Sequence, residues 1–275
     1  LLCQHPDIDV NFHEPQFHDS VFQIALFQGN VYAMNQFAMI SKNGEGVETD
    51  RKQALKYLKN AINRGDLNSI PKYKQTIEDS YEIEFDIEDI EELNKFGKML
   101  YYGDQINCNL KEAVNFFQLA ATKGSVDAMN NYAWMLDNGE GIETDKKLAA
   151  FYYKMAADKG NVEAMKNFAW MIQTGDGVKI DLNESLKYYK MAADAGDVDS
   201  AIKFASLIEN SNNNESLFYY KMAADEGNVE AMYKYAKKLI DNKDNLEEAC
   251  HYLKSAADND NVDAMNLLAL MLDKG

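Results

Sequence analysis

The two tryptophans of this 275-residue chain are the side chains whose spacing first points to a function. Trp134 and Trp170 stand 36 residues apart, and an asparagine, Asn131 or Asn167, precedes each of them by three residues. An indole can cover the side chains of a bound partner, and an amide can hydrogen-bond its backbone. The chemistry of this pattern is the binding of a protein or an extended peptide.

The patterns that would support metal, cofactor or nucleophilic chemistry are weak. His5, His13 and His18 are spaced by eight and five residues, which does not place them on one helix face, and no cysteine pair joins them. Cys250 and His251 are sequence neighbours, a spacing that does not support a nucleophile with its base. The sequence has no phosphate-binding loop, nucleophile elbow or dinucleotide fingerprint. We therefore expect no enzymatic activity, no cofactor and no bound metal.

The charge balance restricts the class of partner. The net charge is −17, from 45 acidic and 28 basic side chains. A field of this sign repels the phosphates of nucleic acids and anionic membrane surfaces, and it favours basic partners. No run of about 18 apolar residues occurs, so we expect no membrane span. The expected partner is a protein or peptide, with a basic one favoured, and neither nucleic acid nor membrane.

The cysteines indicate a compartment. Cys3, Cys108 and Cys250 lack the paired spacing of a disulfide framework, which favours a reducing environment. We expect the cytoplasm, or the lumen of the endoplasmic reticulum if a signal peptide lies upstream.

The tryptophan spacing belongs to a repeat that runs along most of the chain. Residues 160–165 read Gly-Asn-Val-Glu-Ala-Met, and similar motifs start at 29, 65, 124, 196, 227 and 260. Subtracting successive start positions gives spacings of 36, 59, 36, 36, 31 and 33 residues. A period in the thirties is typical of stacked supersecondary units.

The clearest unit, 124–159, predicts two antiparallel helices. Apolar residues recur at helical spacing over 126–136, and a loop with two glycines follows. Asp145 can cap a second helix over 146–158, which Gly160 ends. On that helix we expect Leu148, Ala149, Tyr152, Met155 and Ala156 to share the buried face. Neither helix can bury its apolar face alone, so neighbouring units must stack.

The repeat also predicts which side of each first helix faces outward. If the motif alanine is position 0, positions 0, 1, 4, 5 and 8 cluster on one side, and positions 3 and 6 lie on the other. The candidate partner-binding residues occupy positions 3 and 6, and they are Gln36, Met39, Asn131, Trp134, Asn167, Trp170, Lys203 and Lys234. The alternative is that Trp134 and Trp170 pack between successive first helices, and the two interpretations are not exclusive.

Several positions that repeat in register resemble a known family. Ala-x-x-x-aromatic-Ala is followed by Gly-x-Gly-Val/Ile, then Asp, then Tyr-Tyr-Lys-Met-Ala-Ala-x-x-Gly. This pattern is similar to the Sel-one-like repeats, short-loop relatives of tetratricopeptide repeats, over about residues 29–65 and 88–275. The resemblance implies an all-α fold, a right-handed α/α superhelical solenoid of antiparallel helix pairs whose first helices line the concave surface.

The function that the resemblance implies is that of a non-catalytic interaction scaffold or adaptor. One alternative is the substrate-targeting module of a larger enzyme, such as a kinase or a ubiquitin-ligase complex. Another is a hydrolase similar to cysteine-rich bacterial relatives, but this chain lacks their regular cysteine pairs.

The departures from the repeat define the expected domains. Residues 1–30 resemble the end of one ankyrin repeat and the start of the next, or form an irregular cap with a helix near 19–28. The solenoid is expected over 31–275, with an acidic insertion or decayed unit near 66–87. A first helix over 67–77 would be disturbed by Pro71, and a helix over about 86–101 would restart the array.

Two expectations concern the acidic stretch and the chain ends. The acidic stretch 78–92 is either a solvated insertion or a site for a basic partner or a cation, although it lacks the spacing of a calcium loop. Because the chain starts at Leu1 and stops where the next loop should begin, we expect the natural sequence to extend further.

Overall fold

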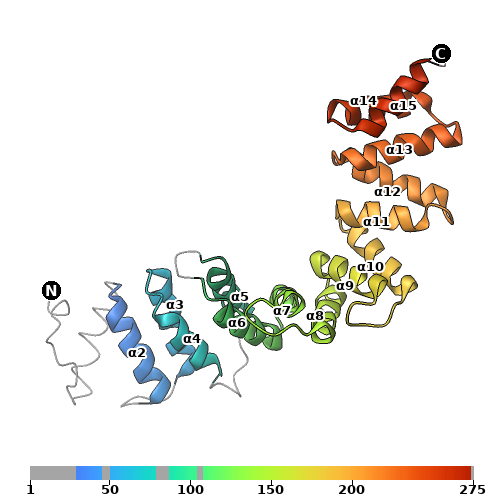
Figure 1. Cartoon of the computed structure of the whole chain (residues 1–275). Helices are drawn as coiled ribbons and strands as arrows, with labels where there is room; N and C mark the ends of the chain where they lie inside the picture. Colours follow the sequence, from blue (N-terminus) through green and yellow to red (C-terminus); the bar gives the residue numbers. More distant parts are fainter. Residues whose placement is uncertain (1–28, 45–49, 79–86, 104–107, 274–275) are drawn as a thin grey trace. The chain divides into compact units, whose positions relative to one another are not determined.

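The computed structural model describes residues 29–44, 50–78, 87–103 and 108–273. These residues form fourteen α-helices, α2 to α15, and no strand (Figure 1). From α2 to α4 and from α7 to α15, each helix packs against the next, which confirms the predicted all-α solenoid of helix pairs. The ankyrin-like or capping segment predicted over 1–30, with its helix near 19–28, lies almost wholly outside the described residues.

The chain divides into two compact units, Leu1–Leu119 and Ala120–Gly275. The helices of the second unit are α7 (Val126–Asn138), α8 (Lys146–Asp158), α9 (Val162–Thr174), α10 (Leu182–Asp194), α11 (Val198–Ile208), α12 (Asn213–Asp225), α13 (Val229–Asn242), α14 (Leu246–Asp258) and α15 (Val262–Asp273). Those of the first are α2 (Val31–Asn43), α3 (Arg51–Asn63), α4 (Ser69–Glu78), α5 (Ile87–Tyr102) and most of α6 (Leu110–Lys123).

The recurring motif is a helix start. The side chain of Asn161 accepts a hydrogen bond from the backbone N–H of Ala164, the motif alanine, at 2.8 Å. Asn, Ser or Asp occupies the same N-cap position before α2, α7, α11, α13 and α15. Gly160 has a φ of +97°, which suits the residue after the end of α8. The motif therefore ends one helix and caps the next.

The two-glycine loops behave as the sequence predicts. Gly139 and Gly141 have φ values of +72° and +73°, and the equivalent Gly175 and Gly177 have +78° and +77°. Asp145 then caps α8 by accepting from the N–H of Leu148 at 3.0 Å. The second helix of this unit spans the predicted residues, Lys146–Asp158.

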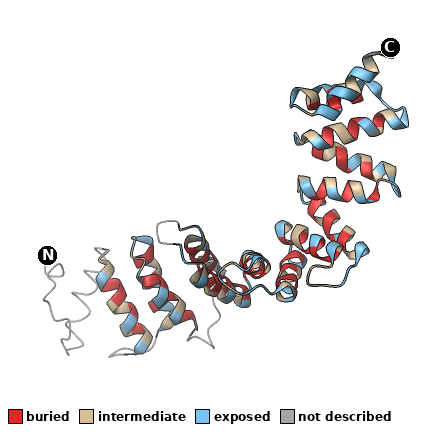
Figure 2. Ribbon diagram, viewed as in Figure 1, coloured by how far each residue is buried: buried red, intermediate tan, exposed pale blue. Residues whose placement is uncertain are grey.

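The core consists of small and aromatic side chains along the lines where helices meet, which Figure 2 shows in red. In α7 all five predicted core residues are buried, and so is Met135, which the prediction missed. In α8 the predicted face was partly wrong. The buried residues are Ala149, Ala150, Tyr153, Ala156 and Ala157, whereas Leu148, Tyr152 and Met155 are only half-buried. The buried face is shifted by one residue from the predicted one, because packing against both α7 and α9 determines which side of α8 is covered.

The first unit contains a helix with a double role. α4 begins at Ser69, and Pro71 lies in its first turn, where helical N–H groups have no partner within the helix. Its Lys74 pairs with Glu112 of α6 at 3.2 Å and lies 5.4 Å from the ring centre of Phe116. In residues 120–275, a lysine on the second helix of one repeat likewise pairs with a glutamate on the second helix of the next repeat. α4 thus follows a first-helix motif but contacts α6 as a second helix would.

The other expectations for this region have mixed outcomes. α5 restarts the array at Ile87, close to the predicted start. Whether residues 66–87 are an insertion or a decayed unit stays a prediction. Most of the acidic stretch 78–92, from 79 to 86, lies outside the described residues.

Candidate protein-binding face

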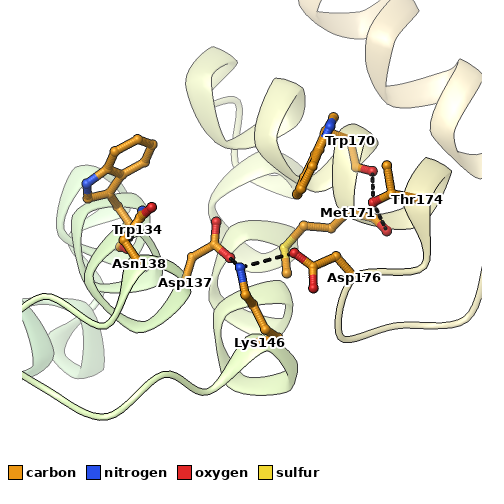
Figure 3. A network of polar contacts seen from close by, with 8 residues as sticks. All are labelled: Trp134, Asp137, Asn138, Lys146, Trp170, Met171, Thr174 and Asp176. Carbon is orange, nitrogen blue, oxygen red and sulfur yellow. Dashed lines mark hydrogen bonds and ion pairs between the residues drawn. The ribbon is translucent and has the colours of Figure 1, made fainter.

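The two indoles lie at equivalent places on α7 and α9, and both face solvent. Trp134 is 42% exposed and Trp170 is 45% exposed, whereas the alanines next to them in sequence, Ala133 and Ala169, are fully buried. The outward direction that the repeat predicts for position 6 is therefore present in both helices. Figure 3 shows each indole projecting from its helix.

The N-terminal ends of these two helices are tied together. The side-chain amide of Asn161, the N-cap of α9, donates to Asp127 Oδ1 in the first turn of α7 at 2.9 Å. The same asparagine caps its own helix, so one side chain sets both the start of α9 and its position beside α7.

The C-terminal ends of the same helices are bridged by one lysine. Lys146 Nζ lies 2.6 Å from Asp137 Oδ1 in α7 and 3.1 Å from Asp176 Oδ2 in the turn after α9 (Figure 3). Its hydrogen bond to Asp137 raises the pKa of Lys146 above its usual value. A Cβ at Gly177 would lie 2.5 Å from the Cβ of Lys146, so the loop needs glycine to pass this close. Sequence periodicity did not reveal this bridge, because a contact between exposed charges does not follow the helical repeat.

The carbonyl groups of the two tryptophans are also satisfied locally. Asn138 Nδ2 donates to the Trp134 carbonyl and Thr174 Oγ1 donates to the Trp170 carbonyl, both at 2.9 Å. These bonds stabilise the last turn of each helix through the tryptophan backbone. The indole rings take no part in them and remain available for contact.

The two predicted asparagines lie beside the tryptophans. Asn131 and Asn167 are both half-buried on α7 and α9. The side-chain nitrogen of Asn167 is buried and has no hydrogen-bond partner among the described residues. Four of the eight candidate residues thus lie on two helices that are tied at both ends.

The other four candidates are in different surroundings. Lys203 of α11 is exposed. Lys234 of α13 pairs with Glu230 at 3.1 Å and lies 5.8 Å from the ring centre of Tyr220, so it is already engaged. Gln36 is half-buried and Met39 is 37% exposed, but both belong to α2 in the first unit. Nothing places them beside the tryptophans.

A second set of contacts, on the second helices, was not predicted. Lys154 Nζ of α8 lies 2.7 Å from Tyr188 Oη and 3.1 Å from Glu184 Oε1, both in α10. Tyr188 Oη in turn donates to Asp158 Oδ1 of α8 at 2.5 Å. Burial works to lower the pKa of Lys154, but its bonds to Tyr188 and Glu184 outweigh burial and raise that pKa.

The same contacts recur from α10 to α12 and from α12 to α14, and we call the whole series the second-helix ladder. Lys190 Nζ pairs with Glu215 at 2.5 Å, and Lys221 pairs with Glu248. Tyr219 donates to Asp194, and Tyr252 donates to Asp225. The sequence signal was a glutamate four residues before a tyrosine in α10, α12 and α14. This ladder joins the second helices of successive repeats.

The described residues give no sign of a metal centre or a membrane span. In the ranges that the structure covers, no three His, Cys, Asp or Glu side chains gather as metal ligands. Among the same residues, no helix combines the length and apolar character that a membrane span requires. Cys108 and Cys250 are free thiols. The expected lack of a cofactor and of a metal stays a prediction.

A family model describes most of the chain. The model of the Sel1 repeat matches residues 31–66, 94–125, 126–161, 162–197, 208–228 and 229–261. No curated protein matches the sequence.

Two solved structures share the fold. One is c5321, a protective antigen present in uropathogenic Escherichia coli strains and displaying an SLR fold. The TM-score is 0.61 at 22% identity, over 92% of this chain and 59% of the antigen. The chain thus spans less than two thirds of that protein. The other is a Sel1 repeat protein from Oxalobacter formigenes, with a TM-score of 0.58 at 18% identity, over 95% of this chain and 83% of that one.

Proposed function

Because this chain belongs to the Sel1 repeat family, whose solenoids are typically protein-interaction modules, we propose that it is a non-catalytic scaffold that binds a protein or peptide on the face of Trp134 and Trp170. The observation that carries the proposal is the pair of indoles, 42% and 45% exposed, on helices that are tied at both ends. We place this face on the concave surface that the family resemblance implies for the first helices.

The energetics favour a binding role for the indoles. Covering the exposed part of one indole stabilises a complex by about 2–3 kcal/mol, so the two together supply about 5 kcal/mol. Because Asn161 and Lys146 hold α7 and α9 in place, little ordering of the face is needed when a partner binds. Rigid aromatic anchors of this kind are common at the centre of protein interfaces.

The asparagines suit the backbone of an extended partner. The unpaired side-chain nitrogen of Asn167 is a donor that a peptide carbonyl can satisfy after a change of rotamer. Asn131 occupies the equivalent position on α7, one repeat earlier. We infer that the bound segment is extended, with its carbonyls near these amides and its side chains on the indoles.

The charges refine the expected partner. The net charge of −17 favours basic proteins at long range. The proposed face itself continues along α11 and α13, where Lys203 and Lys237 are exposed. We therefore expect the bound segment to place apolar side chains on the tryptophans and acidic side chains near these lysines.

The test uses peptides selected from a random display library on the 275-residue chain. The variant Trp134→Ala/Trp170→Ala removes the proposed anchors. The matched control Phe151→Ala/Phe218→Ala removes two aromatics on second helices that are 56% and 62% exposed. We expect the tryptophan variant to lose binding by about a hundredfold or more, and the control to bind like the wild type, with helical circular dichroism unchanged in both.

Two results would count against this function. Equal loss in the control would mean that the selected peptides bind exposed aromatics nonspecifically. A loss of helicity in the tryptophan variant would favour the alternative that the indoles pack between first helices.

The compartment is part of the proposal. Cys108 and Cys250 are free, and neither has the other as a disulfide partner. Free thiols suit a reducing compartment, so we place the protein in the cytoplasm.

A further inference from the structure

The connection between α11 and α12 is short, and it leaves an aliphatic side chain uncovered. Residues 209–212 join these two helices, whereas the longer two-glycine loop 175–181 joins α9 to α10. Leu207, on α11 just before the short connection, is 38% exposed. The residues at the same position of α7 and α9, Met135 and Met171, are fully buried. This repeat thus exposes an apolar position that the two preceding repeats cover.

A second exposed leucine lies beside Leu207. Leu182 is the first residue of α10 and is 57% exposed, and α10 packs directly against α11. One repeat later the same two positions are held by Asn213 and Lys238, and Lys238 Nζ donates to Asn213 Oδ1 at 2.9 Å. This equivalence places Leu182 and Leu207 within reach of each other, and we call them the aliphatic pair.

The neighbouring repeats place polar residues where this repeat places aliphatic ones. The connection 243–245 after α13 is short as well, and there the two positions hold the hydrogen-bonded Asn213 and Lys238. Ile180, two residues before Leu182, is 55% exposed, and polar Thr144 and Ser211 stand at its position in the adjacent repeats. A short connection therefore does not require exposed aliphatic side chains, so these side chains point to an apolar contact.

We propose that the aliphatic pair is a further contact site for the extended segment that binds Trp134 and Trp170, and that it takes an aliphatic side chain of that segment. The inference rests on the proposed function, because the segment is held at the tryptophans. Leu207 directly follows Ser206, which occupies the tryptophan position in its repeat. The first helices α7, α9 and α11 then each contribute one apolar contact in succession.

The repeat spacing predicts where the aliphatic residue lies in the segment. Neighbouring packed helices are about 8–10 Å apart, and an extended chain advances about 3.3 Å per residue. One repeat therefore corresponds to about three residues of the segment. We expect the aliphatic residue about three positions beyond the residue that covers Trp170, on the side away from Trp134.

The size of the site favours one side chain of a held segment over a second copy of the chain. The exposed parts of Leu182, Leu207 and Ile180 amount to roughly 200 Å² of apolar surface. A stable dimer buries about 1,200–2,000 Å². The aliphatic pair is too small to hold a dimer, but it can bind one side chain of a segment that is anchored on the next helix.

The test uses the fluorescein-labelled peptide that binds the 275-residue chain most tightly after the display selection, and fluorescence anisotropy measures its affinity. Leu182→Asn/Leu207→Lys installs the polar pair that the next repeat already contains, so the fold can accommodate it. We expect this variant to bind about tenfold more weakly, with unchanged helical circular dichroism. Leu182→Asn alone adds no charge and should weaken binding about threefold.

The matched control is Leu246→Asn. Leu246 is the first residue of α14, as Leu182 is of α10, and it is 51% exposed. It lies outside the stretch from α7 to α11, so its substitution should leave binding unchanged. Equal weakening by Leu182→Asn and Leu246→Asn overturns the inference, and so does unchanged binding of both Leu182→Asn and the double variant.

A change in the peptide tests the pairing directly. Replacing the predicted aliphatic residue with alanine should weaken binding to the wild type about tenfold. The same peptide change should have little effect on the Leu182→Asn/Leu207→Lys chain, because that contact is already lost. Additive losses would show that the peptide residue and the aliphatic pair do not meet.

Two comparisons separate this inference from the proposed function and from self-association. A loss of binding in Trp134→Ala/Trp170→Ala without a loss in the leucine variants leaves the proposed function intact and overturns the inference. A loss in the leucine variants alone contradicts the proposed function, and with it the claim that one segment covers both sites. Sedimentation of the chain alone should show no association that Leu182→Asn/Leu207→Lys abolishes, since such an association would make a second copy the occupant.

Discussion

Removing one hydroxyl from the core should stabilise this protein. Tyr153 in α8 is fully buried, and its hydroxyl has no hydrogen-bond partner among the described residues. Burial raises the pKa of Tyr153 well above its usual value, as expected for a hydroxyl kept from water. Leaving such a group unpaired costs about 1–3 kcal/mol, so Tyr153→Phe should raise the free energy of unfolding by about 1 kcal/mol after a small loss of packing.

An equivalent residue provides the matched control. Tyr220 in α12 is also fully buried, but its hydroxyl donates to Glu209 Oε2 at 3.2 Å. Tyr220→Phe removes that bond and should lower the free energy of unfolding by about 1 kcal/mol. The two variants delete the same atom at the same repeat position, so the sign of the change depends on the partner alone.

Urea unfolding followed by circular dichroism at 222 nm measures both variants. Repeat arrays can unfold in more than one step, so the midpoints are compared as well as the fitted free energies. The reasoning predicts a higher midpoint for Tyr153→Phe and a lower one for Tyr220→Phe. Equal destabilisation by both would refute it, because it would mean that the Tyr153 hydroxyl is satisfied in solution.

Three further changes test the packing, the titration and the caps. A Cβ at Gly97 would lie 2.6 Å from two ring carbons of buried Phe117. Gly97→Ala should therefore lower the melting temperature, since overpacking costs about 1–3 kcal/mol against about 1 kcal/mol of helix propensity. Burial raises the pKa of Tyr189 to about 12, from 10.0 when unfolded, so its contribution is complete below pH 10 and is lost as pH rises toward 12. Tyr189→Phe should make the loss of stability above pH 10 shallower in thermal melts. Asn161→Ala should cost about 1–2 kcal/mol in urea unfolding, whereas Asn161→Ser, which can still cap as Ser125 does, should cost less.

The sequence was most informative where one residue determines the local backbone. The cap by Asp145, the positive φ of Gly139 and Gly141, and the limits of α8 all follow from residues within a few positions of each other. The outward direction of Trp134 and Trp170 follows from the helical repeat in the same way. Local rules and periodicity were sufficient for these features.

Features that depend on contacts between distant residues were not predictable in this way. Lys146 bridges Asp137 and Asp176 because two loops approach each other, and no local pattern records that distance. The contact of Lys74 with Glu112 shows that α4 takes a second-helix role, although a first-helix motif precedes it. The buried face of α8 was misjudged by one residue, because packing against both α7 and α9 determines which side of the helix is covered.

The quenching of tryptophan fluorescence by acrylamide tests the proposed function most directly. Trp134 and Trp170 are the only tryptophans in the chain, so all of the indole emission comes from the proposed face. With a tryptophan-free peptide from the selection bound at saturation, we predict a lower quenching constant and a blue-shifted emission, since both indoles become covered. A peptide that binds while the quenching and the emission stay unchanged would show that the partner lies elsewhere on the molecule.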